Sequence, residues 1–103
     1  MAEERRAGPA RMEVRLTGEI DHHRAGELMR ELEDRLDLEA PREVELDLSG
    51  VGFMDSSGIA LLIRVYRALA LTGGTMLVTR VPKQPGKVLR AAGLSRLFPI
   101  SYQ

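Results

Sequence analysis

Short segments with an apolar residue at every second position alternate along this chain with longer segments of helical period. In the first, Met12, Val14 and Leu16 alternate with charged residues, which is the period of a strand that is buried on one face. Four segments are predicted as strands: RMEVRLTGEI (residues 11–20, broken or bent at Gly18), EVELDL (43–48), TMLVTR (75–80) and LFPIS (97–101). This alternation constrains the fold more than any other feature of the sequence.

Three segments between the strands have helical spacing of their apolar residues. They are predicted as helices over residues 21–36, over residues 57–71 and within QPGKVLRAAG, residues 84–93. Asp21 is placed to cap the start of the first helix, and glycines at 73 or 74 and at 93 are placed to end the other two.

Strands that alternate with helices define an α/β fold with right-handed crossovers. Because the strands are apolar on one face only, we expect a small mixed β-sheet with the helices packed mainly on one side and a polar face opposite. If the first two strands are neighbours, Arg11 and Arg15 can face the acidic residues of the second. A chain of 103 residues is expected to form one domain, here residues 11–103, after a polar N-terminal tail at residues 1–10.

Composition excludes several function classes. Fifteen basic and fifteen acidic residues cancel, and we expect the basic and acidic residues to be interleaved along the chain. Because only four aromatic residues are available for base stacking as well, no nucleic-acid partner is expected. The absence of cysteine excludes disulfides, thiolate zinc sites and cysteine nucleophiles. No apolar run approaches the roughly 20 residues of a membrane span, and MAEERRAGPA lacks a signal-peptide core, so a cytoplasmic protein without a membrane partner is expected.

The segment SGVGFMDSSGIALLIRV, residues 49–65, leads from a strand into a helix through Asp55, Ser56 and Ser57. A side-chain oxygen at such a junction accepts a backbone N–H that has no partner within the helix. One cap needs only one of the three residues, so at least one hydroxyl is left free at the carboxyl end of a strand, where α/β folds commonly place their sites. A bound anion, a nucleophile and a covalent phosphate all fit such a junction.

Enzymatic readings of this junction find little support elsewhere in the sequence. A serine nucleophile needs a base, and the G-x-S-x-G elbow is absent, as is a phosphate-binding loop. Asp21, His22 and His23 form a D-H-H motif, but adjacent residues point in divergent directions and no second metal-binding motif follows. No catalytic residue, metal ligand or cofactor is expected. Catalysis through Ser56, or through a metal at Asp21 and His22, is kept as a third hypothesis, behind two hypotheses in which the chain is not an enzyme.

The helix that follows Ser57 has two distinct faces. One arc is apolar and assigned to the core: Ile59, Leu62, Ile63, Val65, Tyr66, Leu69 and Ala70. The other is small, partly apolar and basic: Ala60, Leu61, Arg64, Arg67, Ala68 and Leu71. This second face is either a solvated helix surface or a face that docks another protein.

Three blocks of the sequence, RLTGEIDHHRAGEL, DLSGVGFMDSSGIALLIRVYRAL and VLRAAGLSRLFPI, together resemble the STAS domain in its anti-sigma factor antagonist form. The resemblance runs from about Met12 to Ile100, with the blocks in the order of the family. D-S-S-G after a strand is the most specific piece, and L-T-G-E-I-D points to the sporulation-type members in particular among the antagonists of sporulation and stress responses.

The resemblance implies a regulator that is the substrate of an enzyme and not itself one. The unmodified antagonist binds an anti-sigma factor that is also a serine kinase, and so frees the sigma factor. The kinase phosphorylates the first serine of D-S-S-G, here Ser56, and the product dissociates until a metal-dependent serine phosphatase resets it.

The resemblance and the helix face together give a predicted partner-binding surface. Its residues are Asp21, Asp55, Ser56, Ser57, Gly58, Ala60, Leu61 and Arg64. The alternative function is a STAS subunit of a transporter or of a larger signalling complex, in which the same face docks a different partner and the serine is unmodified.

Overall fold

The computed structural model describes residues 2–8 and 10–103, with side chains from residue 10 onward. Its elements, in chain order, are β1 (Ala2–Gly8), β2 (Arg11–Ile20), α1 (His22–Glu39), β3 (Glu43–Met54), α2 (Ser56–Leu71), β4 (Thr75–Val81), α3 (Lys83–Ala92), the 3-10 turn η1 (Leu94–Arg96) and β5 (Ile100–Tyr102).

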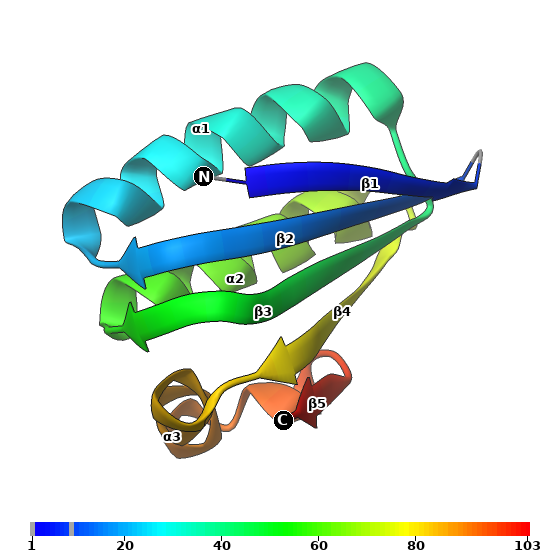
Figure 1. Ribbon diagram of the computed structural model, residues 1–103. Helices are drawn as coiled ribbons and strands as arrows, with labels where there is room; N and C mark the ends of the chain where they lie inside the picture. Colours follow the sequence, from blue (N-terminus) through cyan, green and yellow to red (C-terminus); the bar gives the residue numbers. More distant parts are fainter. Residues whose placement is uncertain (1, 9) are drawn as a thin grey trace.

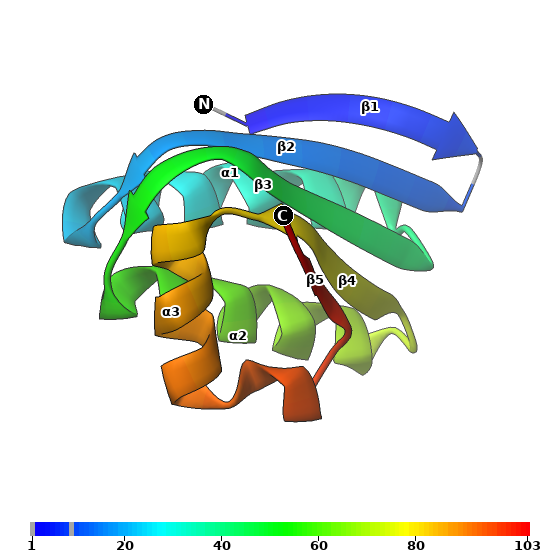
Figure 2. The ribbon, with the colours of Figure 1, turned by 60° about the horizontal axis from the view of Figure 1, so that its bottom comes forward.

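The strands form one sheet in the order β1-β2-β3-β4-β5. The pairs from β2 to β5 are parallel and β1 is antiparallel to β2, so the sheet is mixed. Figure 1 shows the order of the strands, and Figure 2 shows α1, α2 and α3 together beneath the sheet. The predicted α/β fold with helices on one face is confirmed.

The prediction of a polar tail over residues 1–10 is wrong for β1. This strand pairs with β2 in a register that sets Ala2 opposite Leu16 and Arg6 opposite Met12. The sequence AEERRAG has no apolar alternation, but an antiparallel ladder is made by main-chain groups and needs no such pattern. Residues 1 and 9 of the predicted tail lie outside the described residues.

The core lies between the sheet and the helices. Alternate residues of β2 and β3 that face the helices are fully buried, among them Met12, Val14, Leu46 and Leu48. They pack against the apolar stripes of the helices: Leu28 and Leu32 from α1, Leu62, Val65 and Leu69 from α2, and Leu89 from α3. Burial at about 25 cal/mol per Å² of apolar surface is the main force that holds the helices to one face.

The opposite face of the sheet carries charged side chains. Arg11 pairs with Glu45 and lies 3.4 Å from Glu43, which confirms the expected contact between β2 and the acidic residues of β3. Asp47 departs from the expected polar surface, because it is only 1% exposed. Its Oδ1 accepts the Ser49 N–H at 2.9 Å. This carboxylate therefore bonds to the main chain of β3 and is not a charge on the surface.

Several element boundaries differ from the prediction, and the largest difference is in β3, which continues beyond residue 48 to Met54. α1 continues beyond residue 36 to Glu39, and its C-cap is Ala40, whose φ of 44° is in the left-handed region just before Pro41. The last strand begins only at Ile100, because Pro99 has no N–H to give to a ladder. Within the described residues, no helix is both long enough and apolar enough to cross a membrane.

Candidate functional site

Two aspartates lie side by side at the carboxyl ends of β2 and β3. Ile20 and Met54 are paired in the parallel register, and Asp21 and Asp55 follow them directly. Asp21 caps α1 by accepting the Arg24 N–H at 2.9 Å, and Asp55 caps α2 by accepting the Ser57 N–H at 2.8 Å. The predicted cap at Asp21 is therefore confirmed, and of the three polar residues at 55–57 the aspartate is the cap of α2.

Ser56 is left free by this arrangement. It is the first residue of α2, its side chain is exposed, and its hydroxyl makes no hydrogen bond within the part of the chain that the structure describes. The N-terminal end of a helix carries unpaired N–H groups and a positive partial charge. Ser56 therefore presents a free hydroxyl at a place that tolerates negative charge.

Ser57 and Gly58, which follow Ser56, are both less exposed to solvent than Ser56 is. Ser57 is half-buried, whereas Gly58 is buried, and a Cβ added to it would lie 2.4 Å from Met54 Cγ. Gly58 belongs to the predicted partner-binding surface. The structure gives the space above its Cα to the side chain of Met54, so its small size serves packing within this chain.

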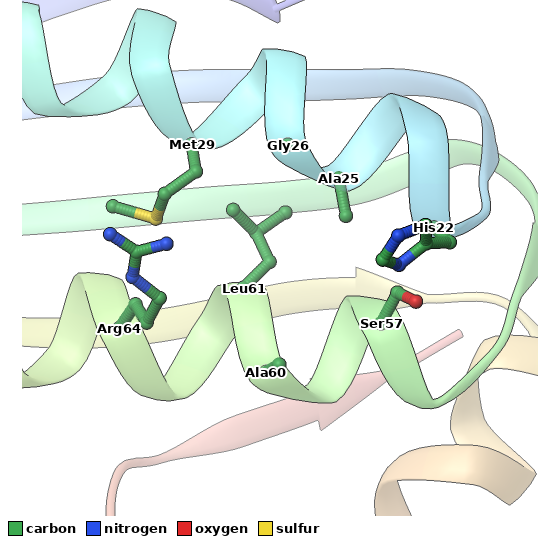
Figure 3. Close-up of a pocket in the computed structure, with 8 residues that line it drawn as sticks. All are labelled: His22, Ala25, Gly26, Met29, Ser57, Ala60, Leu61 and Arg64. Carbon is green, nitrogen blue, oxygen red and sulfur yellow. The ribbon is translucent and has the colours of Figure 1, made fainter.

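A groove of about 200 Å³ lies between α1 and α2 (Figure 3). It is lined by His22, Ala25, Gly26, Met29, Ser57, Ala60, Leu61 and Arg64. His22 and Ser57 lie at the end nearest the N-termini of both helices, and Arg64 lies further along α2 (Figure 3). Small residues at positions 25, 26 and 60 leave this hollow open, with an apolar floor and polar ends.

The helix face predicted for docking is only partly at the surface. Ala60 and Arg64 are exposed, and Arg64 Nη2 lies 3.3 Å from Glu33 Oε2 of α1. Leu61 was expected on this face, but it is only 2% exposed because α1 packs beside α2 and covers it. Ala70, assigned to the core by the helical wheel, is exposed. A helical wheel treats one helix alone and does not include the neighbouring helix α1. It therefore assigned Leu61 and Ala70 to the wrong faces of α2.

Gln84 of α3 holds the strand end that precedes Asp55. Its Oε1 accepts the Met54 N–H at 2.8 Å, and its Nε2 donates to the Met54 carbonyl at 3.0 Å. The side-chain amide thus pairs with both main-chain groups of Met54, as a neighbouring strand would. No pattern in the sequence indicates this role, because a single glutamine in a helix is an ordinary surface residue.

Phe53 is a second residue that the sequence reasoning missed. It is 39% exposed, next to the exposed Gly52 and two residues before Asp55. Exposed aromatic rings are enriched where proteins bind one another. The signal in the sequence was the break in alternation over VGFM, residues 51–54, which places a large apolar side chain outside the core.

The site is chemically simple. An activated nucleophilic serine requires an adjacent base in hydrogen-bonding contact, and no described side chain makes such a contact with Ser56. What the geometry offers is an exposed hydroxyl next to the Asp55 cap, the Asp21 cap at the end of the neighbouring strand, a hollow between two helices and an exposed ring. Such a surface is suited to recognition and to modification by another protein.

A family model described as STAS domain matches residues 3–103. The anti-sigma F factor antagonist of Paenibacillus polymyxa is 31% identical over 87 residues, which are 84% of this chain and 74% of the relative. The anti-sigma factor antagonist SpoIIAA in its unphosphorylated form has a similar structure, with a TM-score of 0.83 and 22% identity over 97% of this chain and 87% of that one. The phosphorylated form of SpoIIAA from Bacillus covers 97% of this chain and 90% of its own, with a TM-score of 0.74 and 22% identity.

The chain belongs to the STAS domain family, as its resemblance predicted. Within that family its similarity is to antagonists of anti-sigma factors, by sequence to the Paenibacillus relative and by fold to SpoIIAA.

Proposed function

We propose that this chain is an anti-sigma factor antagonist, which binds an anti-sigma factor and thereby frees a sigma factor. The names of the Paenibacillus relative and of the structurally similar SpoIIAA support the proposal. The surface around Asp21, Asp55 and Ser56 supports it as well, because it offers recognition groups without a catalytic arrangement.

Phosphorylation of Ser56 switches the binding off. In this step the anti-sigma factor acts as a serine kinase: a new bond forms between Ser56 Oγ and the γ-phosphorus of ATP. The bond to the ADP oxygen breaks, and the hydroxyl proton passes to a base of the kinase. The observation that carries this assignment is the exposed Ser56 hydroxyl, which is free because Asp55 makes the helix cap.

The phosphate changes the docking surface and leaves the fold in place. It adds about −1.5 to −2 charges at the N-terminus of α2, where helix N–H groups and the helix dipole favour an anion. Asp21 and Asp55 already make this edge acidic. A partner that fits the neutral hydroxyl then meets added bulk and three neighbouring negative groups, so the complex dissociates.

The chain acts in this cycle as a substrate and not as an enzyme. A metal-dependent serine phosphatase hydrolyses phospho-Ser56, with water supplying the oxygen that leaves with the phosphate, and restores the binding form. The groove between α1 and α2, with Ala60 and Arg64 on its rim, accepts the side chains of the anti-sigma factor next to the switch.

A pull-down from native lysate with mass spectrometry tests the binding switch. The wild type is expected to capture a small ATP-binding kinase, and Ser56→Asp is expected to reduce that capture about tenfold or more. Ser101→Asp is the matched control, because it adds the same charge at an exposed serine of β5. Equal capture of transporter subunits by all three proteins would instead support the alternative STAS function.

Phosphorylation by the captured kinase tests the acceptor. Ser56→Ala is expected to abolish incorporation of phosphate, whereas Ser57→Ala, at a half-buried position, is expected to retain most of it. Incorporation that survives Ser56→Ala and is lost in Ser57→Ala would show that the acceptor is misassigned.

A further inference from the structure

Acidic and basic residues are segregated between the two halves of the sequence. Residues 1–55 hold all fifteen acidic residues and eight basic ones, and residues 56–103 hold seven basic residues and no acidic one. The formal charge of zero is therefore the sum of a net charge of −7 in residues 1–55 and a net charge of +7 in residues 56–103. The expectation that the two signs are interleaved along the chain is wrong for the second half.

The helix α3 presents a basic stripe. Lys83, Lys87 and Arg90 follow one another at i, i+4 and i+7, and all three are exposed. Arg90 is held in position, since its guanidinium carbon lies 3.9 Å from the centroid of the Tyr102 ring. Neither lysine forms an ion pair with any residue that the structure describes.

The helix α1 presents an acidic stripe of the same spacing. Glu27, Glu31 and Asp34 also follow at i, i+4 and i+7, and they are exposed or half-exposed. Neither Glu31 nor Asp34 has an ion-pair partner among the described side chains, and both line a surface hollow next to Leu38, which is 85% exposed. Each stripe is about 10 Å long at 1.5 Å per residue, so the three charges of one stripe can match the three of the other.

The two stripes cannot meet within one molecule. Figure 1 shows α1 and α3 at opposite ends of the helix layer, with α2 between them. We propose that α3 of one copy docks on α1 of a second copy, with Lys83, Lys87 and Arg90 against Glu27, Glu31 and Asp34. Because the two surfaces differ and lie at opposite ends, the contact is head to tail and can repeat from copy to copy.

A second copy fits the charges better than a nucleic acid does. A polyanion would be attracted to the basic half and repelled by the acidic half of a chain whose formal charge is zero. The rings near α3 are not free for base stacking, since Tyr102 lies under Arg90 and Phe98 is 4% exposed. A second copy carries both signs in the same segregated arrangement.

Sedimentation velocity over a range of protein concentrations tests this contact. At about 0.01 M salt, where charges act over about 30 Å, the wild type is expected to associate as its concentration rises, and at about 1 M salt it is expected to be monomeric. Lys83→Glu with Lys87→Glu, and separately Glu31→Lys with Asp34→Lys, are each expected to weaken association about tenfold or more.

The chain with all four substitutions separates stripe matching from net charge. This exchanged chain has two of the three charges of each stripe reversed and a formal charge of zero again. With the two helices antiparallel, Arg90 still faces Glu27 and each reversed charge faces another reversed charge, so it is expected to associate as the wild type does. A wild type that stays monomeric at low salt overturns the proposal, whether or not it binds duplex DNA. So does association that the paired substitutions leave unchanged, or an exchanged chain that is folded by circular dichroism but remains monomeric.

Discussion

Replacement of Gln84 by alanine removes a side chain that stands in for a neighbouring strand. The register between β3 and β4 ends at Asp47 and Thr79, seven residues before Met54. At Met54 the side-chain amide of Gln84 supplies one acceptor at 2.8 Å and one donor at 3.0 Å. The alanine variant leaves both main-chain groups of Met54 without these partners, directly before the cap of α2.

The expected loss follows from the hydrogen bonds and from burial. A typical hydrogen bond contributes about 0.5–1.5 kcal/mol net, and a buried group left without a partner costs about 1–3 kcal/mol. Both bonds are only part-buried, so water can replace some of what is lost. We expect Gln84→Ala to lower the free energy of unfolding by about 2 kcal/mol. That loss corresponds to a fall in Tm of roughly 10 °C for a domain of this size.

Urea unfolding followed by circular dichroism measures this loss. Lys87→Ala is the matched control, because Lys87 is exposed on the same helix and has a helix propensity close to that of glutamine. Native-state hydrogen exchange at the Met54 amide should also accelerate in Gln84→Ala and not in the control. If the two variants unfold within about 0.5 kcal/mol of each other, the side-chain amide does not hold the strand end and the reasoning is refuted.

The remaining predictions concern the two helix starts. Gly58→Ala is expected to lower the free energy of unfolding by about 1–3 kcal/mol, because the new Cβ would lie 2.4 Å from Met54 Cγ. Gly26→Ala, with no atom within 4 Å of the new Cβ, is expected to raise it by about 0.5–1 kcal/mol. Asp55→Ala is expected to cost about 0.5–2 kcal/mol through loss of the cap, whereas Ser56→Ala should stay within about 0.5 kcal/mol of the wild type. Urea unfolding of the four variants checks all of these, and a loss at Ser56 as large as that at Asp55 would contradict the assignment of the cap.

The parts of the fold that were predictable from sequence are those that bury an apolar pattern. Met12, Val14 and Leu16 marked β2 because alternation is required when one face of a strand is buried. β1 has no such face in its sequence and was missed, although its main chain pairs with β2. Asp47 was placed correctly on the helix-free face, but its burial depends on neighbouring strands and side chains that a single segment does not reveal.

The candidate site was predictable where a side chain bonds to the backbone of a residue close to it in the sequence. Asp21 and Asp55 cap the helices that directly follow them, a local interaction over two or three residues. Gln84 acts on Met54 across 30 residues, and Leu61 is covered by another helix. Their roles depend on how separate elements pack, and no pattern within either segment encodes that packing.

The division of roles at the start of α2 explains how this edge can carry a switch. Asp55 makes the cap and Gln84 holds the strand end, so both conditions for starting the helix are met without the Ser56 hydroxyl. A side chain that contributes little to the fold can change its charge without unfolding it. Had the serine been the cap, modification would have removed the acceptor of a helix N–H and coupled the state of the partner surface to the stability of α2. Because the hydroxyl is free, a change at Ser56 acts on whatever binds there.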